Sequence, residues 1–116
     1  MSAQDLAPAD VARWMAERAI LLVDVREPDE YAAERIHGAL LYPLSTFDPR
    51  ALPDTSQTKI VFQCGSGMRS AKAMAAAGAA GLSVAGHLTG GLKAWKDAGL
   101  PVISIDPDTG KSRERR

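Results

Sequence analysis

Residues 59–70 read KIVFQCGSGMRS, in which a largely apolar run leads through a cysteine into a glycine-rich segment. The run 59–63 is typical of a strand that is buried on both faces of a parallel sheet. Arg69 then opens an alanine-rich segment that favours a helix as far as Ala80. Glycines allow successive N–H groups to turn inward, and a helix N-terminus adds unpaired donors. The stretch therefore predicts an anion-binding loop within an α/β fold.

The segments on either side alternate between helical and strand-like patterns, which is typical of the same fold class. Helices are expected over Ala9–Arg18, from Pro28 to about Glu34 and over Leu92–Ala98, and strands over Ile20–Val25, Ala39–Leu44 and Ser83–Leu88. Residues Ser45–Thr58 contain prolines and aspartates and predict a loop with a turn of helix. Strands that alternate with helices imply right-handed crossovers and a parallel sheet that is covered on both faces.

The length and the end of the chain predict one domain with a charged tail. A chain of 116 residues can bury roughly two thirds of its unfolded surface, which is enough for one core. We assign this domain to residues 1–105. Seven of the last eleven residues are charged and none is aliphatic or aromatic, so residues 106–116 are expected to form a disordered tail.

The composition excludes several classes of function. The 14 basic and 14 acidic side chains cancel, so we expect no nucleic-acid partner. Cys64 is the only cysteine, which excludes an intramolecular disulfide and a multi-cysteine metal site and fits a reducing, cytoplasmic compartment. The start has no signal-peptide pattern, and the aliphatic run 19–23 is far shorter than the roughly 20 residues of a membrane span. We expect no membrane segment, metal or cofactor.

The position of Cys64 indicates a reactive thiol. Ligands of parallel sheets bind outside the carboxyl ends of the strands, where residues 24–26 are expected beside Cys64. Lowering a cysteine pKa from ~8.5 to about 6.5 requires roughly 2.7 kcal/mol. A helix dipole supplies only ~0.3 to 2 kcal/mol, whereas each hydrogen bond to a charged acceptor supplies roughly 1.5 to 3. Two or three N–H groups of the loop would therefore suffice. The alternative is a small buried core residue, which a lone cysteine often is.

Four segments in order resemble the rhodanese-like sulfurtransferases over about Leu6–Pro101. They are Asp24-Val25-Arg26-Glu27 with Glu30-Tyr31, Arg35-Ile36-His37-Gly38-Ala39, Cys64-Gly65-Ser66-Gly67-Met68-Arg69-Ser70, and Gly90-Gly91-Leu92-Lys93-Ala94-Trp95. Arg35 stands where the family often has a histidine, and His37 where it often has a proline. The resemblance implies a rhodanese-like α/β fold, with a central parallel sheet of about five strands and helices on both faces.

The resemblance also implies a two-step transfer of sulfur. Cys64, the catalytic nucleophile, would attack the outer sulfur of thiosulfate or a similar small donor, so that sulfite leaves and a persulfide remains. Cyanide or a thiol, a protein thiol included, would then accept the sulfur. The substrate-binding loop would comprise Gly65, Ser66, Gly67, Met68, Arg69 and Ser70. No general base is required if the thiolate is already formed, which agrees with a sequence that has no histidine next to this loop.

Two alternatives remain beside the sulfurtransferase reading. Phosphatases and arsenate reductases of the same fold have five residues between cysteine and arginine, whereas four separate Cys64 from Arg69 here. The tighter loop favours sulfur over phosphate. A non-catalytic sulfur carrier or docking module would also use Cys64, so the sequence does not separate it from an enzyme.

Other polar residues are assigned supporting or structural roles. Asp24 would orient the loop or pair with Arg69, which can fold over the cradle and clamp an anion. Arg26 and Glu30 are expected to hold the rim together by ion pairing. His37 and His87 are taken as ordinary loop or strand-end residues. Three further expectations concern single side chains: Trp14 and Trp95 pack their helices, and Ser66 and Met68 flank the pocket mouth.

Overall fold

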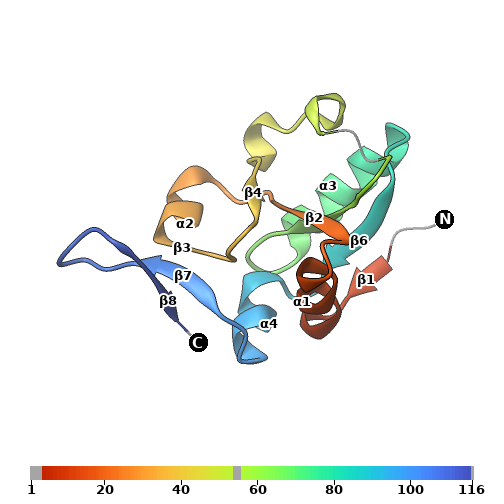
Figure 1. The fold of residues 1–116 in the computed structure, drawn as a ribbon. Helices are drawn as coiled ribbons and strands as arrows, with labels where there is room; N and C mark the ends of the chain where they lie inside the picture. Colours follow the sequence, from red (N-terminus) through yellow and green to blue (C-terminus); the bar gives the residue numbers. More distant parts are fainter. Residues whose placement is uncertain (1–3, 54–55, 116) are drawn as a thin grey trace.

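The computed structural model describes residues 4–53 and 56–115, and it contains a parallel sheet of five strands with the order β1-β6-β5-β2-β4 (Figure 1). The strands are β1 (Gln4–Leu6), β2 (Ile20–Asp24), β4 (Leu40–Leu41), β5 (Lys59–Gln63) and β6 (Val84–Leu88). Every pairing within this sheet is parallel. The predicted fold class, an α/β fold with a central parallel sheet of about five strands, is confirmed.

Helices cover the sheet, and two hydrophobic clusters lie on its opposite faces. The helices are α1 (Pro8–Ala16), α2 (Pro28–Ala33), α3 (Met68–Ala79) and α4 (Gly91–Asp97), with the 3-10 turns η1 (Leu44–Thr46) and η2 (Pro49–Ala51). Successive residues of a strand face opposite sides, so Val61 joins Val11 of α1 and Trp95 of α4 in one cluster. Phe62 joins Ala73 and other residues of the second cluster, over which α3 packs. The central strands are therefore buried on both faces, as their apolar pattern predicts.

A second, antiparallel sheet of three strands corrects the prediction for the C-terminal segment. Its order is β3 (Glu34–Arg35), β7 (Val102–Ile105) and β8 (Ser112–Arg115). The expected disorder of residues 106–116 is wrong for 106–115, while residue 116 lies outside the described residues. All four side chains of β8 are exposed, so this strand is held by its backbone pairing with β7. The prediction failed because amino-acid composition shows how much apolar surface a segment can bury, but not whether its backbone pairs with a neighbouring strand.

Several element boundaries differ from the predicted ones for local reasons. The helix expected to reach Arg18 ends at Ala16, because Arg18 takes a left-handed conformation with φ 56°. The strand expected over Ala39–Leu44 is reduced to two residues, since Pro43 cannot donate to a strand ladder and Leu44 begins η1. The predicted turn of helix within Ser45–Thr58 is present as η1 and η2, and its positions 54–55 lie outside the described residues.

The membrane and domain expectations have different outcomes. Among the residues that the structure describes, no helix is both long and apolar enough to cross a bilayer. The assignment of residues 1–105 to a single domain stays a prediction, and residues 1–3 of that range lie outside the described part of the chain.

Candidate functional site

Cys64 follows β5 at the carboxyl end of the sheet, beside the end of β2. Asp24 of β2 pairs in register with Gln63 of β5, so the two predicted rim segments lie together. The side chain of Cys64 is buried, with 1% of its residue surface exposed. Gly67 then takes φ 107°, a left-handed conformation that glycine adopts readily, and α3 begins at Met68. The loop thus turns back over the sulfur before the helix starts.

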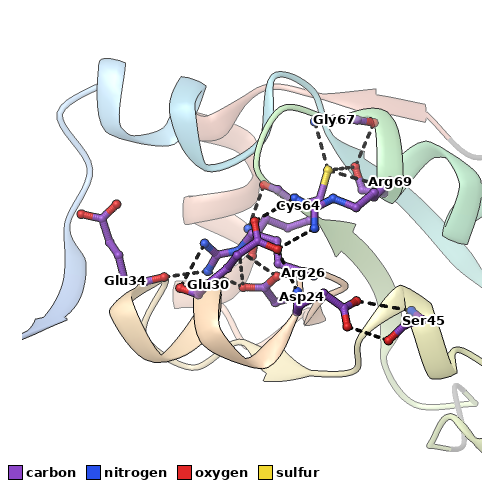
Figure 2. Close-up of polar contacts among 11 residues, drawn as sticks. Asp24, Arg26, Glu30, Glu34, Ser45, Cys64, Gly67 and Arg69 are labelled. Carbon is purple, nitrogen blue, oxygen red and sulfur yellow. Dashed lines mark hydrogen bonds and ion pairs between the residues drawn. The ribbon is translucent and has the colours of Figure 1, made fainter.

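Backbone and side-chain donors converge on the sulfur of Cys64. The N–H of Gly67 lies 3.0 Å from Sγ (Figure 2). The N–H of Ser70 lies 3.3 Å from Sγ, and the Ser70 hydroxyl oxygen lies 3.5 Å from it. Burial raises the pKa of the thiol, and these contacts together with the Ser66 N–H lower it. The net direction is downward, so the pKa of Cys64 lies below its ordinary value. The site can therefore hold a thiolate or another anion on that sulfur.

The turn at Gly90 and Gly91 contacts the backbone of the loop at Cys64 and Gly65. The N–H of Leu92 donates to the Cys64 carbonyl at 2.8 Å, and the N–H of Lys93 donates to the Gly65 carbonyl at 3.2 Å. A Cβ atom at Gly91 would lie 2.5 Å from that Cys64 oxygen. Only a residue without a side chain permits this approach, so the segment that resembles the family's closing motif helps to set the loop's shape.

Arg69 pairs with Glu30 and not with Asp24. Its two terminal nitrogens lie 2.6 and 2.9 Å from the Glu30 carboxylate oxygens, on the first turn of α2 (Figure 2). Hydrogen bonding to Arg69 lowers the pKa of Glu30 to about 2. The guanidinium lies beside the loop: a Cβ atom added at Gly65 would lie 3.4 Å from its Nη2 atom. The predicted Asp24–Arg69 pairing is wrong: Asp24 is already engaged by a nearer cation.

That cation is Arg26, which forms a buried ion pair with Asp24. The Nη2 atom of Arg26 lies 2.8 Å from Asp24 Oδ2, and the two side chains are 5% and 0% exposed. The same Nη2 atom donates to the carbonyl of Glu34 at 2.7 Å, and Nη1 donates to the carbonyl of Glu30 at 3.4 Å (Figure 2). Arg26 therefore ties the end of β2 to α2, which carries the partner of Arg69. The predicted ion pairing of the rim is confirmed, with partners that the sequence did not specify.

His87 is the polar residue that sequence reasoning missed. Its Nδ1 atom lies 2.8 Å from Ser70 Oγ, and its Nε2 atom lies 2.9 Å from Asp5 Oδ1. The expectation that no histidine lies beside the loop is thus wrong. His87 is 17 residues from Ser70 in sequence, but β6 pairs with β5, and His87 stands opposite Phe62. Its place near the end of a predicted parallel strand was the signal, because such ends meet at one edge.

The two tryptophans pack as predicted, whereas the place of Ser66 and Met68 at a pocket mouth stays a prediction. Ser66 and Met68 are exposed at the loop, and Met68 is 73% exposed. Trp95 is buried and donates to the Pro101 carbonyl at 2.8 Å, and Trp14 packs against the cluster that contains Val11. Within residues 4–53 and 56–115 no three histidine, cysteine or carboxylate side chains are grouped so that they could hold a metal ion.

Comparison with known proteins shows which family this chain resembles. A family model described as the rhodanese-like domain matches residues 7–98. The uncharacterized protein slr1261 of Synechocystis is 41% identical over 98 residues, which cover 84% of this chain and 55% of that protein. This chain thus spans about half the length of that relative. A sulfurtransferase of Allochromatium vinosum is 35% identical over 85 residues, or 73% of this chain and 79% of that protein.

A solved structure agrees with both the fold and the family. The rhodanese-like domain of the Anabaena Alr3790 protein superposes with a TM-score of 0.78 at 26% identity. The match covers 90% of this chain and 81% of that structure. The similarity therefore extends over most of the chain and is not confined to the loop after Cys64.

Proposed function

This chain belongs to the rhodanese-like domain family, and from that premise we propose that it is a sulfurtransferase that carries sulfane sulfur as a persulfide on Cys64. The observation that supports this most strongly is the convergence of the Gly67 and Ser70 N–H groups on the buried sulfur. These donors stabilise an anion at the position where the reaction begins with a thiolate and continues with a persulfide anion.

In the first step, the Cys64 thiolate attacks the outer sulfur of a donor such as thiosulfate. A new S–S bond forms to Cys64, the bond within the donor breaks, and sulfite leaves with the bonding electron pair. The terminal sulfur then lies within the loop of Gly65, Ser66, Gly67, Met68, Arg69 and Ser70, which we propose as the substrate-binding residues. Asp24 and Arg26 support this loop indirectly, because they fix the helix that carries the partner of Arg69.

In the second step, a nucleophile such as cyanide or a thiol attacks the terminal sulfur. The S–S bond to Cys64 breaks, and the Cys64 thiolate is regenerated as the leaving group. Because the sequence holds one cysteine, no second thiol of the same chain can accept this sulfur. The acceptor is therefore another molecule, and exposed Met68 lies where that molecule would approach. We place this chemistry in the cytoplasm, where a free thiol stays reduced.

The first experiment is intact-mass analysis of the protein after treatment with thiosulfate. We expect the parent chain to gain the mass of one sulfur atom and to lose it on addition of cyanide. The Cys64→Ser variant should gain nothing under the same conditions. A parent chain that gains no sulfur from thiosulfate or from a low-molecular-weight persulfide would refute the proposal.

Turnover distinguishes an enzyme from a sulfur carrier. Continuous production of thiocyanate from thiosulfate and cyanide, lost in Cys64→Ser, is expected of the enzyme. A single round of sulfur loading without turnover would instead favour the carrier or docking module. Cys64-dependent hydrolysis of an aryl phosphate would favour the phosphatase alternative, which the four-residue spacing between Cys64 and Arg69 disfavours.

A further inference from the structure

A chain of hydrogen bonds connects the buried sulfur of Cys64 to the molecular surface. It passes from Sγ to Ser70 Oγ over 3.5 Å, from that oxygen to His87 Nδ1 over 2.8 Å, and from His87 Nε2 to Asp5 Oδ1 over 2.9 Å. The hydroxyl of Ser70 is fully buried and the His87 side chain is 8% exposed, whereas the Asp5 side chain is 75% exposed. The first three groups are thus shielded from water, and the last one is in contact with it.

The number of hydrogens in this chain determines which protonation states are compatible with it. A serine hydroxyl has one hydrogen to donate, and the carboxylate of Asp5 can only accept. Asp5 therefore requires a hydrogen on Nε2 of His87. If His87 is neutral, its Nδ1 must accept the Ser70 hydrogen, and Cys64 can contact Ser70 only as a thiol donor. If His87 is protonated, Nδ1 donates, and the Ser70 hydrogen is released to stabilise a thiolate.

The carbonyl of Gly67 is a further acceptor for the Ser70 hydrogen, at 3.2 Å. It also accepts the N–H of Ala71 at the start of α3. The contact between Ser70 and His87 is the shorter of the two, so in the neutral state we assign the hydroxyl hydrogen to His87. In the protonated state the imidazole no longer competes for it.

We propose that His87 is a positioning residue that takes up the Cys64 proton through Ser70 and so forms a thiolate–imidazolium pair. The thiol proton passes to the Ser70 oxygen while the Ser70 hydrogen passes to Nδ1 of His87. The products are a Cys64 thiolate, an unchanged Ser70 hydroxyl and an imidazolium that donates to Asp5. Protons and charge balance, and no further reactant is required. The relay deepens the proposed function by supplying its nucleophile.

The groups around His87 are compatible with a positive charge on its ring. Among the described residues, Asp5 of β1 hydrogen-bonds the ring directly and Cys64 is linked to it through Ser70, and a carboxylate and a thiolate are both better partners for a charged ring than for a neutral one. On β5 the ionisable residue is Lys59, at the opposite end of that strand from Phe62, which pairs with His87. On α3, Arg69 is bound to Glu30 and Lys72 is exposed.

The test measures the rate at which iodoacetamide alkylates Cys64 as a function of pH. The rate follows the thiolate fraction, so its midpoint reports the pKa of Cys64 without sulfur transfer. His87→Asn retains an amide near Nδ1 that hydrogen-bonds Ser70 but does not take up a proton. We expect its midpoint to rise by about one pH unit, which is a tenfold lower rate below the midpoint. His37→Asn, at an exposed loop residue, is the matched control and should leave the midpoint unchanged.

Asp5→Asn tests the same relay at an exposed position where folding is not at risk. We expect a rise in the same direction but smaller, because water screens the exposed carboxylate. The relay would be overturned if the midpoint stayed unchanged in both Asp5→Asn and a folded His87→Asn. If His87→Asn does not fold, an unchanged midpoint in Asp5→Asn alone would overturn it. Sulfur loading of the parent chain with unshifted midpoints would refute the relay and leave the proposed function intact. Shifted midpoints in a chain that takes up no sulfur would support the relay and refute the proposed function.

Discussion

The carboxylate of Glu30 determines what Arg69 can offer a substrate. Glu30 holds the guanidinium with two hydrogen bonds, and its Oε1 also accepts the N–H of Glu27 in the capping box of α2. The charge of Arg69 is thus already paired with a carboxylate. The arginine and its carboxylate form one side of the rim, and under the proposed function the donor anion would be bound by the N–H groups of the loop.

The Glu30–Arg69 pair predicts an acid-sensitive contribution to stability. The pKa of Glu30 is lowered from 4.5 to about 2, so the folded state favours the charged carboxylate. This contribution is fully present above pH 4.5 and is lost as the pH falls toward 2. About a third of each side chain is exposed, so solvent screening limits the pair to roughly 0.5–1 kcal/mol.

Glu30→Gln should therefore lower the free energy of unfolding by about 0.5–1 kcal/mol at neutral pH, and the difference from the parent should shrink as the pH approaches 2. Urea unfolding at several pH values measures this difference. Glu17→Gln, which removes an exposed partner 3.6 Å from Arg13, is the control and should change stability by less than about 0.5 kcal/mol. A constant difference at all pH values would show that the variant acts through packing instead.

At the scale of elements, the turn between β6 and α4 serves as the base of the active loop. Two consecutive N–H groups of α4 donate to the carbonyls of Cys64 and Gly65, and these bonds fix the backbone from which the Gly67 N–H points at the sulfur. The active loop is therefore shaped by a segment more than twenty residues further along the chain.

Gly91→Ala should disrupt this base. The new Cβ atom would lie 2.5 Å from backbone atoms of Cys64 and Gly65, and φ at this position is 61°. We expect a loss of about 2–3 kcal/mol in unfolding free energy and a slower alkylation of Cys64 at neutral pH. Gly78→Ala is the matched control, because its Cβ would meet nothing within 4 Å and helix α3 would gain about 0.5–1 kcal/mol. If Gly91→Ala kept the parent's stability and thiol reactivity, the turn would not support the loop.

The elements that the sequence predicts are those with a strong local pattern. Strands β2, β5 and β6 and helices α1, α3 and α4 follow from apolar runs, alanine content and glycine stops. Strands β1, β3 and β8 are short, mostly exposed or partly exposed, and exist because a partner strand is in place. Local propensity does not report on such pairing.

The same distinction applies to the site. Cys64 and its donors are contiguous in sequence, so the anion cradle could be derived from residues 64–70 alone. The partners of Arg69 and Ser70 come from α2 and β6, at sequence separations of 39 and 17. Which carboxylate contacts Arg69 and which histidine contacts Ser70 depends on the strand order and register, and no single segment of the sequence determines these. The sequence therefore predicts the loop that surrounds Cys64, but not the side chains that contact Ser70 and Arg69.

At the scale of the whole molecule, the central strand β7 and the outer strand β8 of the second sheet differ in what they contribute to the core. Val102 of β7 is 4% exposed and belongs to the same core cluster as Trp95, whereas β8 buries no side chain. Residues 106–115 are thus held to the rest of the molecule through β7 and not through the parallel sheet.

Removal of residues 106–116 should consequently leave the site unchanged. We expect the truncated chain to lose no more than about 1–2 kcal/mol of unfolding free energy, because only backbone hydrogen bonds at an edge are removed. Its sulfur loading and the pH midpoint of Cys64 alkylation should match those of the parent. Truncation after Leu100 is the control: it also removes β7 and the Pro101 carbonyl that accepts the Trp95 N–H, so the core cluster is opened. Loss of sulfur loading in a folded chain that ends at Ile105 would contradict this division, because it would mean that the hairpin acts on the loop across the helices that separate them.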